Sequence, residues 1–290
     1  MELFAQSVVL GLITGLVYSL TGAGLVSVYR TSRIINFAQG SIGTLGLYAA
    51  YPLTERGAPY WLVAIVAIGA AALAGLCVGW IVNLLASRRD ELMGGLAAIA
   101  LSLVIDSVLT LTMGGSARAF PSMGTHTLFR VASVNFTASD VGIAAAAIIA
   151  FGALGLLFSR TTTGLGMRAI SENATAARIV GLRSGALRMG SWVICGILAG
   201  VGALFLAPMY SLTPTSIEGE LVYGFAAVVI GGFDSIIGAL VAGIGLGIVS
   251  NLIGVYVNLD LITTGLFAVM IPVLLLRPYG LFGRRPLERV

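Results

Sequence analysis

The sequence contains no lysine, so all sixteen of its basic residues are arginine. A P-loop uses a lysine to contact nucleotide phosphates, and an imine-forming enzyme uses a lysine amine as its nucleophile. The single histidine, His126, is best explained as a solvated loop residue and argues against a multi-histidine metal site. The chain is therefore predicted to be non-catalytic and to bind no metal and no nucleotide cofactor.

Charged residues are also scarce. They make up 10% of the chain, whereas 58% of it is hydrophobic and the mean hydropathy is +1.02, which is typical of a polytopic membrane protein. Cys77 and Cys195 lie in apolar runs, so they are interpreted as small buried hydrophobic residues and not as a disulfide. The net charge of +4 is spread as arginines over short loops, which favours a topological role over nucleic-acid binding.

Apolar runs divide the chain into nine segments, two of them short. The runs are Leu3–Val28, Gly40–Leu53, Tyr60–Ala86, Leu92–Met113, Val141–Phe158, Met189–Pro208, Leu221–Ile230, Ser235–Tyr256 and Leu261–Leu276. Because Leu221–Ile230 is too short to cross about 30 Å of hydrocarbon as a helix, it is predicted to be re-entrant or half of a broken helix. The expected fold is an all-α, polytopic transmembrane helical bundle with about eight to ten membrane segments, in which residues 1–290 form a single transmembrane domain.

Arginine placement predicts the orientation. The first run has no basic residue before it and two after it, unlike a signal peptide. If the N-terminus is outside and all nine runs cross, the C-terminus is cytoplasmic and thirteen arginines lie inside. Only Arg56, Arg118 and Arg130 then lie outside, which agrees with the positive-inside rule.

Polar or glycine-rich breaks interrupt the apolar pattern at two places, Asn36–Gly40 and Gly231–Asp234. Both follow an apolar lead and precede Ser-Ile with glycine-spaced apolar residues, which indicates either an internal repeat or chance similarity between glycine-rich helices. Paired broken segments mark substrate paths in many transporters. The predicted path includes Asn36, Gln39, Gly231, Gly232, Asp234 and Ser235.

The amides of the first break have two interpretations. Asn36 and Gln39 would offer hydrogen bonds to a polar solute, or would satisfy backbone groups freed by the break. Asp234 has two as well, because it precedes a helix and suits an N-cap, or lies where a helix start would receive a substrate carboxylate. Glu218 and Glu220 are expected to be solvated loop charges, with contact to a binding protein as the alternative.

Asp106 completes the predicted path. It lies in an otherwise uncharged run, where an acidic side chain costs about 2.5–3.5 kcal/mol on insertion scales. It would either act on the translocation path or be a protonated structural group bonded to Ser102, Ser107 or Thr110.

The longest predicted inside loop is Ser159–Arg188. Its residues Leu165–Leu182 are predicted to form one amphipathic helix that ends at Gly181. The apolar side comprises Met167, Ile170, Ala174, Ala177 and Val180. Such a helix suits docking into a groove on another protein, or lies flat on the lipid surface.

Several stretches resemble one family. The run GMRAISENATAARIVGLRSGALRMGSWVICGILAGVGALFLAP, together with INFAQGSIGTLGLYAAY, AAVVIGGFDSIIGALVAGIGLGIV, RPYGLFG and the helix 101–114, is similar to the permease subunits of branched-chain amino acid ABC importers, the LivH/LivM family. The resemblance implies a bacterial inner-membrane subunit that works with two ATP-binding subunits, a second permease subunit and an extracytoplasmic solute-binding protein. A heterodimer of permeases is favoured over a homodimer, and ATP and Mg²⁺ are expected only in the partner ATPases.

The resemblance also implies which residues couple to the ATPases. They are Gly164, Met167, Arg168, Ala169, Glu172, Ala176, Ala177 and Gly181. Three departures from the family pattern leave the solute open: Gln39 replaces a common histidine, Asp234 a common glycine, and Asp106 an uncharged amide. Family members carry leucine, isoleucine and valine, other amino acids, or urea and short amides. A stand-alone secondary transporter or channel is the alternative from another class.

Overall fold

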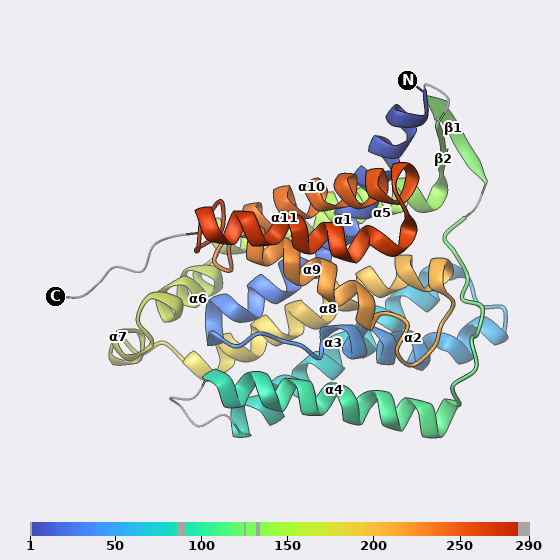
Figure 1. The fold of residues 1–290 in the computed structure, drawn as a ribbon. Helices are drawn as coiled ribbons and strands as arrows, with labels where there is room; N and C mark the ends of the chain where they lie inside the picture. Colours follow the sequence, from blue (N-terminus) through green and yellow to red (C-terminus); the bar gives the residue numbers. More distant parts are fainter. Residues whose placement is uncertain (1, 86–90, 125, 132–133, 284–290) are drawn as a thin grey trace.

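The computed structural model describes residues 2–85, 91–124, 126–131 and 134–283 (Figure 1). Its elements are α1 (Glu2–Ser32), α2 (Gln39–Glu55), α3 (Tyr60–Leu85), α4 (Glu91–Met113), β1 (Thr127–Val131), β2 (Val134–Thr137), α5 (Ala138–Arg160), α6 (Thr162–Glu172), α7 (Ala174–Ile179), α8 (Ser184–Tyr210), α9 (Glu218–Gly231), α10 (Ile236–Tyr256), the 3₁₀ helix η1 (Leu259–Leu261) and α11 (Ile262–Leu276).

The prediction of a polytopic helical bundle is confirmed, since each of the nine apolar runs overlaps one helix. Among the described residues, seven helices are long and apolar enough to cross a membrane, whereas α2 and α9, from the two short runs, are not among them. The predicted outside loop also contains an antiparallel hairpin of β1 and β2. The predicted end of the third run, Ala86, and the topological arginines Arg88, Arg89, Arg284, Arg285 and Arg289 lie outside the described residues.

Helix α1 lies in the middle of the bundle, against α10, α8 and α9. Glycines allow the close approach: a Cβ atom added at Gly15 would lie 2.6 Å from the Cα of Ile244 in α10. The same holds for α3 and α8, where a Cβ atom at Gly75 would lie 2.6 Å from the carbonyl oxygen of Trp192. Small residues therefore set the spacing between these helices.

Helices α2 and α9 begin inside the bundle and not at its ends (Figure 1). Irregular backbone leads into each of them, over residues 33–38 and 211–217. From their starting points the two helices run in opposite directions, α2 towards the hairpin and α9 towards α6. Non-helical backbone at membrane depth is tolerated only where protein buries it or a cavity solvates it. The chain therefore contains two half-length helices, each preceded by an irregular segment.

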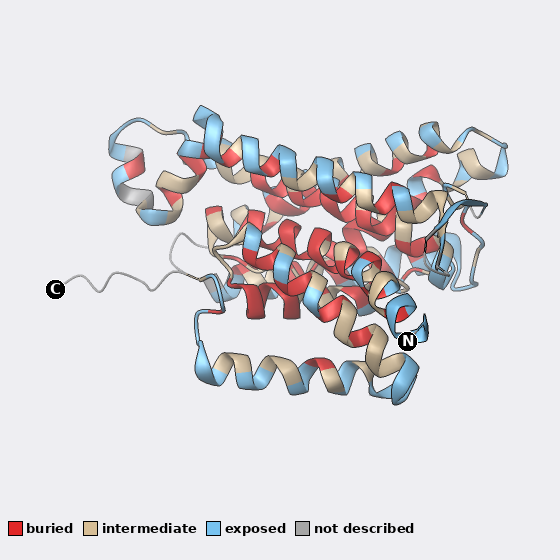
Figure 2. Cartoon of the chain, turned by 90° about the horizontal axis from the view of Figure 1, so that it is seen from above, coloured by how far each residue is buried: buried red, intermediate tan, exposed pale blue. Residues whose placement is uncertain are grey.

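Buried residues fill the middle of the bundle, and the outer helices turn exposed faces outward (Figure 2). Those outward faces are largely apolar. Examples are Leu73, Leu111, Ile148 and Leu275, which are all exposed. Cys77 also lies on such a face, so the prediction that it is buried is wrong, while Cys195 is buried as predicted. An apolar exterior around a close-packed interior is what a bilayer requires of a helical bundle.

The predicted cytoplasmic segment is two helices, and the prediction of one continuous helix is wrong. The break falls at Asn173, whose side-chain oxygen accepts a hydrogen bond from the amide of Ala176 at 3.0 Å and so begins α7. Asparagine is a strong N-cap because it satisfies an otherwise unbonded amide of the first turn. Gly181 follows α7 with a φ of +85°, as expected of a glycine that ends a helix.

Candidate functional site

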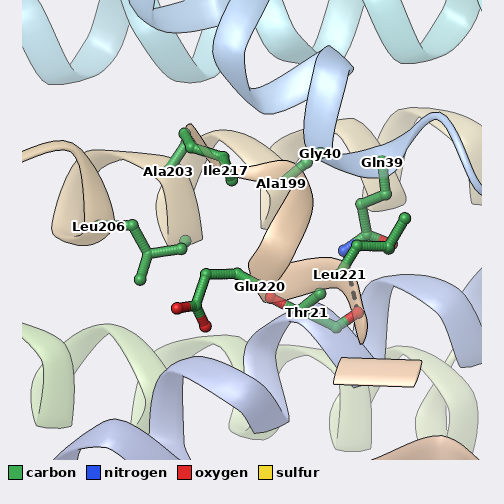
Figure 3. Close-up of a pocket in the computed structure, with 10 residues that line it drawn as sticks. Thr21, Gln39, Gly40, Ala199, Ala203, Leu206, Ile217, Glu220 and Leu221 are labelled. Carbon is green, nitrogen blue, oxygen red and sulfur yellow. Dashed lines mark hydrogen bonds between the residues drawn. The ribbon is translucent and has the colours of Figure 1, made fainter. Parts of the chain in front are cut away.

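A relay of hydrogen bonds holds the break before α2 against α1 and α8. The side-chain amide of Asn36 donates to the sulfur of Cys195 at 3.2 Å, and the thiol donates to Oε1 of Gln39 at 3.2 Å. Nε2 of Gln39 then donates to the carbonyl of Thr21 in α1 at 2.9 Å, the dashed bond in Figure 3. The side chains of Asn36, Cys195 and Gln39 are all buried, so the relay is shielded from solvent.

The relay bears on the two interpretations of the amides. The side-chain oxygen of Asn36 also accepts a hydrogen bond from the backbone amide of Ala38 at 3.1 Å. The structure therefore contains the backbone-satisfying bonds that one interpretation requires, while direct contact with a solute stays a prediction. Cys195 was missed as a member of this network, because a cysteine in an apolar run gives no sequence signal for hydrogen bonding.

A small pocket lies beside the relay, between α1, α2, α8 and α9 (Figure 3). Its lining is mostly small or apolar, with three polar side chains. The lining residues are Thr21, Gln39, Gly40, Ala199, Gly202, Ala203, Leu206, Ile217, Glu220 and Leu221. In this conformation it admits little more than a water molecule, so a solute passes only if the surrounding helices separate.

Asp106 joins α4 to the start of α2. Its Oδ2 accepts a hydrogen bond from the hydroxyl of Ser41 at 3.0 Å, and Oδ1 has no partner among the described residues. None of the predicted hydroxyls bonds to the carboxyl group of Asp106 among the described contacts: those of Ser102 and Ser107 donate to other backbone carbonyls, and that of Thr110 donates to the backbone carbonyl of Asp106 itself. The partner thus lies on another helix, which spacing within one run did not reveal.

Glu220 is the functional candidate that sequence reasoning misplaced. It was expected to be a solvated loop charge, but it lies in the first turn of α9 and is only 5% exposed. The error arose because the apolar run begins at Leu221, which put the preceding acid outside the membrane segment. The one available signal was the shortness of that run, which indicated a segment starting inside the bundle.

The second predicted break forms the turn between α9 and α10. The carbonyls of Ile230 and Gly231, at the end of α9, accept hydrogen bonds from the amides of Leu281 and Phe282 at 2.7 and 3.0 Å. Gly232 has a φ of +104°, which favours glycine. The C-terminal RPYGLFG stretch therefore satisfies the end of α9, and the glycines allow this close approach.

Asp234 does not cap α10, because the hydroxyl of Ser235 accepts the hydrogen bond from the amide of Gly238 at 2.9 Å. Asp234 instead forms an ion pair with Arg33 at 3.2 Å. The same guanidinium donates to the carbonyl of Ser171 in α6 at 3.2 Å. Burial by itself would lower the pKa of Arg33, but the charge of Asp234 raises it, so the guanidinium stays ionised.

Arg33 therefore joins three parts of the chain that are far apart in the sequence and that sequence analysis did not connect. It follows α1, pairs with the α9–α10 turn and bonds to the predicted coupling segment. Its φ of +59° is uncommon for a residue with a side chain, and its amide bonds to the carbonyl of Tyr29 at 2.8 Å, which closes the end of α1. The structure thus connects Arg33 and Asp234 to α6, whereas the Gln39 relay lies inside the bundle.

Within the coupling segment, the predicted apolar side is partly correct. Met167, Ile170 and Ala177 are buried. Val180 is 79% exposed because it follows the end of α7. The side chain of Ala174 is not among those that the structure describes. Of the other predicted coupling residues, Gly164 is buried, Arg168 and Ala169 are half-buried, and Glu172, Ala176 and Gly181 are exposed. Leu165, Ile179 and Val180 form the exposed apolar part of this segment.

Comparison with known proteins adds family information to this geometry. The family described as branched-chain amino acid transport system, permease component, matches residues 7–276. The high-affinity branched-chain amino acid transport system permease protein LivH of Salmonella typhimurium is 28% identical over 302 residues, covering 99% of this chain and 98% of that protein. BraD of Pseudomonas aeruginosa, a permease protein of the same description, is 29% identical over 303 residues, with the same coverage.

A solved structure has a similar fold. It is an inward-facing structure described as a metal-chelate type ABC transporter, with a TM-score of 0.52 and 14% identity, covering 92% of this chain and 85% of that chain. At this identity the likeness concerns the fold alone.

Proposed function

The chain belongs to the family of branched-chain amino acid transport system permease components, and on that premise we propose that it moves branched-chain or related amino acids through the plasma membrane as a subunit of an ABC importer. The observation that supports this most directly is the buried polar relay of Asn36, Cys195 and Gln39, placed beside a pocket where two half-helices begin. Polar groups inside a membrane bundle are costly to bury and commonly face a solute path or a water-filled cavity.

The proposed assembly contains two permease subunits, two ATP-binding subunits and an extracytoplasmic solute-binding protein. The chain binds no cofactor itself, and ATP and Mg²⁺ belong to the partner ATPases. The N-terminus lies outside and the C-terminus in the cytoplasm, with residues 159–188 facing the ATPases. The arginine bias supports this orientation, since the coupling segment carries several of the inside arginines.

In the proposed mechanism, ATP closes the two ATPases and moves α6 and α7. The exposed side chains of Leu165, Ile179 and Val180 provide an apolar contact for a partner groove. The contacts of Arg33 with Ser171 and Asp234 offer a route from α6 to the α9–α10 turn, and α9 begins at the pocket. Moving α9 relative to α2 would open the pocket and release the solute.

Transport by the reconstituted complex tests this proposal. Proteoliposomes holding both permeases and both ATPases are given the cognate binding protein loaded with radiolabelled leucine, isoleucine, valine or urea. We expect ATP-dependent accumulation of at least one branched-chain amino acid. Accumulation of urea alone would show that the proposed substrate class is wrong. Accumulation without the ATPase subunits would show that the chain is a secondary transporter and not part of an ABC importer.

A further inference from the structure

The starts of α2 and α9 face one position in the bundle. A Cβ atom added at Gly40 would lie 3.3 Å from the Cα of Glu218 and 3.4 Å from the carbonyl oxygen of Ile217, so the first turns of the two helices are in contact. Neither helix has a side chain bonded to its N-terminus as a cap. The amides of Gln39, Glu218 and Glu220 donate to carbonyls of the preceding segments, so only part of the first-turn N–H groups is bonded within the chain. The positive ends of the two helix dipoles add at this place.

Glu220 supplies the opposite charge at the same place. Its side chain lines the pocket together with Gln39 and Thr21 (Figure 3). Tyr210 hydrogen-bonds the carboxyl group of Glu220, but Oε2 has no hydrogen-bond partner among the described residues, and none of the described arginines forms an ion pair with it. A carboxylate that is 5% exposed, with one oxygen unbonded and no cation beside it, is unfavourable unless a proton or a cationic ligand joins it.

The two helix starts and the carboxyl group of Glu220 together favour one class of ligand. A simple cation would bind Glu220 but be opposed by the two helix starts, and a simple anion would bind the helix starts but be opposed by Glu220. A zwitterion that carries an ammonium and a carboxylate a few bonds apart satisfies both. The remaining lining, which includes Ala199, Ala203 and Leu206, suits an apolar side chain.

We propose that the passing solute is a zwitterionic α-amino acid held between α2 and α9, with its ammonium on Glu220 and its carboxylate on the helix starts. This inference rests on the proposed function, because it assigns the part of the chain that recognises the transported amino acid. Glu220 is a specificity-determining residue in this arrangement, and Gln39 lies beside the bound solute as a second hydrogen-bonding group. The pocket widens to admit the solute when the half-helices move apart.

The test compares Glu220→Gln, Glu220→Asp and the control Glu55→Gln in the reconstituted complex with leucine-loaded binding protein. Glu55 is exposed at the other end of α2, so its substitution removes the same charge away from the pocket. We expect Glu220→Gln to lower the rate of leucine uptake by at least about ten-fold, because it removes a charge-assisted contact. Binding-protein-stimulated ATP hydrolysis is retained, Glu220→Asp keeps part of the uptake, and Glu55→Gln matches the wild type.

Uptake by Glu220→Gln equal to that of the wild type would overturn the inference while leaving the proposed function intact, whereas a wild-type complex that carries no amino acid would refute the proposed function itself. If Glu220→Gln fails to assemble, the wild-type complex is treated with a hydrophobic carbodiimide and the modification of Glu220 is measured by mass spectrometry. Leucine is expected to protect Glu220, and its 2-oxo acid, which lacks the ammonium, is not. Equal modification with both compounds would overturn the inference.

Discussion

At the scale of single residues, Gly24 determines where the side chain of Gln39 lies. A Cβ atom added at Gly24 would come within 2.6 Å of Nε2 and 2.9 Å of Oε1 of Gln39. The hydrogen bond from Gln39 to Thr21 therefore depends on the absence of a side chain on α1 at this point. The relay and the pocket lining both include Gln39. A substitution at Gly24 in α1 would therefore alter both, although no polar residue is replaced.

We expect Gly24→Ala to lower solute uptake several-fold while the chain still folds, with the free energy of unfolding reduced by about 1–3 kcal/mol because displacing Gln39 leaves buried hydrogen-bonding groups unpaired. The measurements are uptake by the reconstituted complex and thermal unfolding of the purified chain. Gly69→Ala is the matched control, because an added Cβ atom there meets nothing within 4 Å. Equal uptake by the two variants would mean that the position of Gln39 has no effect on transport.

At the scale of elements, the exposed apolar residues of the coupling segment are the part that a partner would cover. We expect Ile179→Asp and Val180→Asp to reduce copurification of the ATPase subunits strongly, because each puts a charge into an apolar contact. The hairpin residue Leu128, which is 50% exposed, gives the control Leu128→Asp. If all three variants retain the ATPases equally, α7 and the residue after it do not form the contact.

The contact between Arg33 and Asp234 belongs to the same scale, because it joins α1, α6 and the α9–α10 turn. Both side chains are partly exposed, at 39% and 31%, so the pair itself adds no more than about 1 kcal/mol to stability. We expect Arg33→Gln and Asp234→Asn each to raise the number of ATP molecules hydrolysed per solute transported, with little effect on assembly.

The exchanged pair Arg33→Asp with Asp234→Arg is the matched test of this link. Asp tolerates the positive φ of position 33 better than most residues, so the backbone turn can be kept. Partial recovery of the transport-to-hydrolysis ratio would show that the ion pair matters. If the single variants keep the wild-type ratio of transport to hydrolysis, and the exchanged pair does not change it, Arg33 has only its local role at the end of α1.

Sequence reasoning succeeded for elements whose signal is local. The long apolar runs predicted the spanning helices, and Gly181 was correctly identified as the glycine at which the amphipathic segment ends. It failed where two signals of similar strength compete, as at Asn173, whose capping oxygen splits a continuous amphipathic pattern into α6 and α7.

The candidate site was harder to predict than the fold, because its contacts join distant parts of the chain. Asn36 and Gln39 were identified from their place in a polar break, but their bonds to Cys195 cross more than 150 positions of sequence. Asp106 was recognised from its charge, yet its partner Ser41 lies on another helix. A single sequence predicts neither the contacts of Cys195 nor the contact of Asp106 with Ser41, because residue spacing indicates only which side chains share a face of one helix or strand.

At the scale of the whole molecule, the two half-helices determine the arrangement. The sequence predicted that the breaks at Asn36–Gly40 and Gly231–Asp234 correspond, whereas in the structure it is the starts of α2 and α9 that meet. The Gly231–Ser235 turn lies at the far end of α9, where the amides of Leu281 and Phe282 bond to its last carbonyls. Motion at that end therefore reaches the pocket along a single rigid element.

The hydrogen bonds of Cys195 have a kinetic consequence. The thiol is buried, and its bonds to Asn36 and Gln39 cannot persist if α2 separates from α8. In a Cys77→Ser background, which removes the exposed thiol, alkylation of Cys195 by a small uncharged reagent must wait for that separation. We expect its rate to rise when the complex turns over ATP and to stay at the resting value with a non-hydrolysable analogue. The alkylation rate of this one thiol would then report how often α2 separates from α8, without any labelled solute.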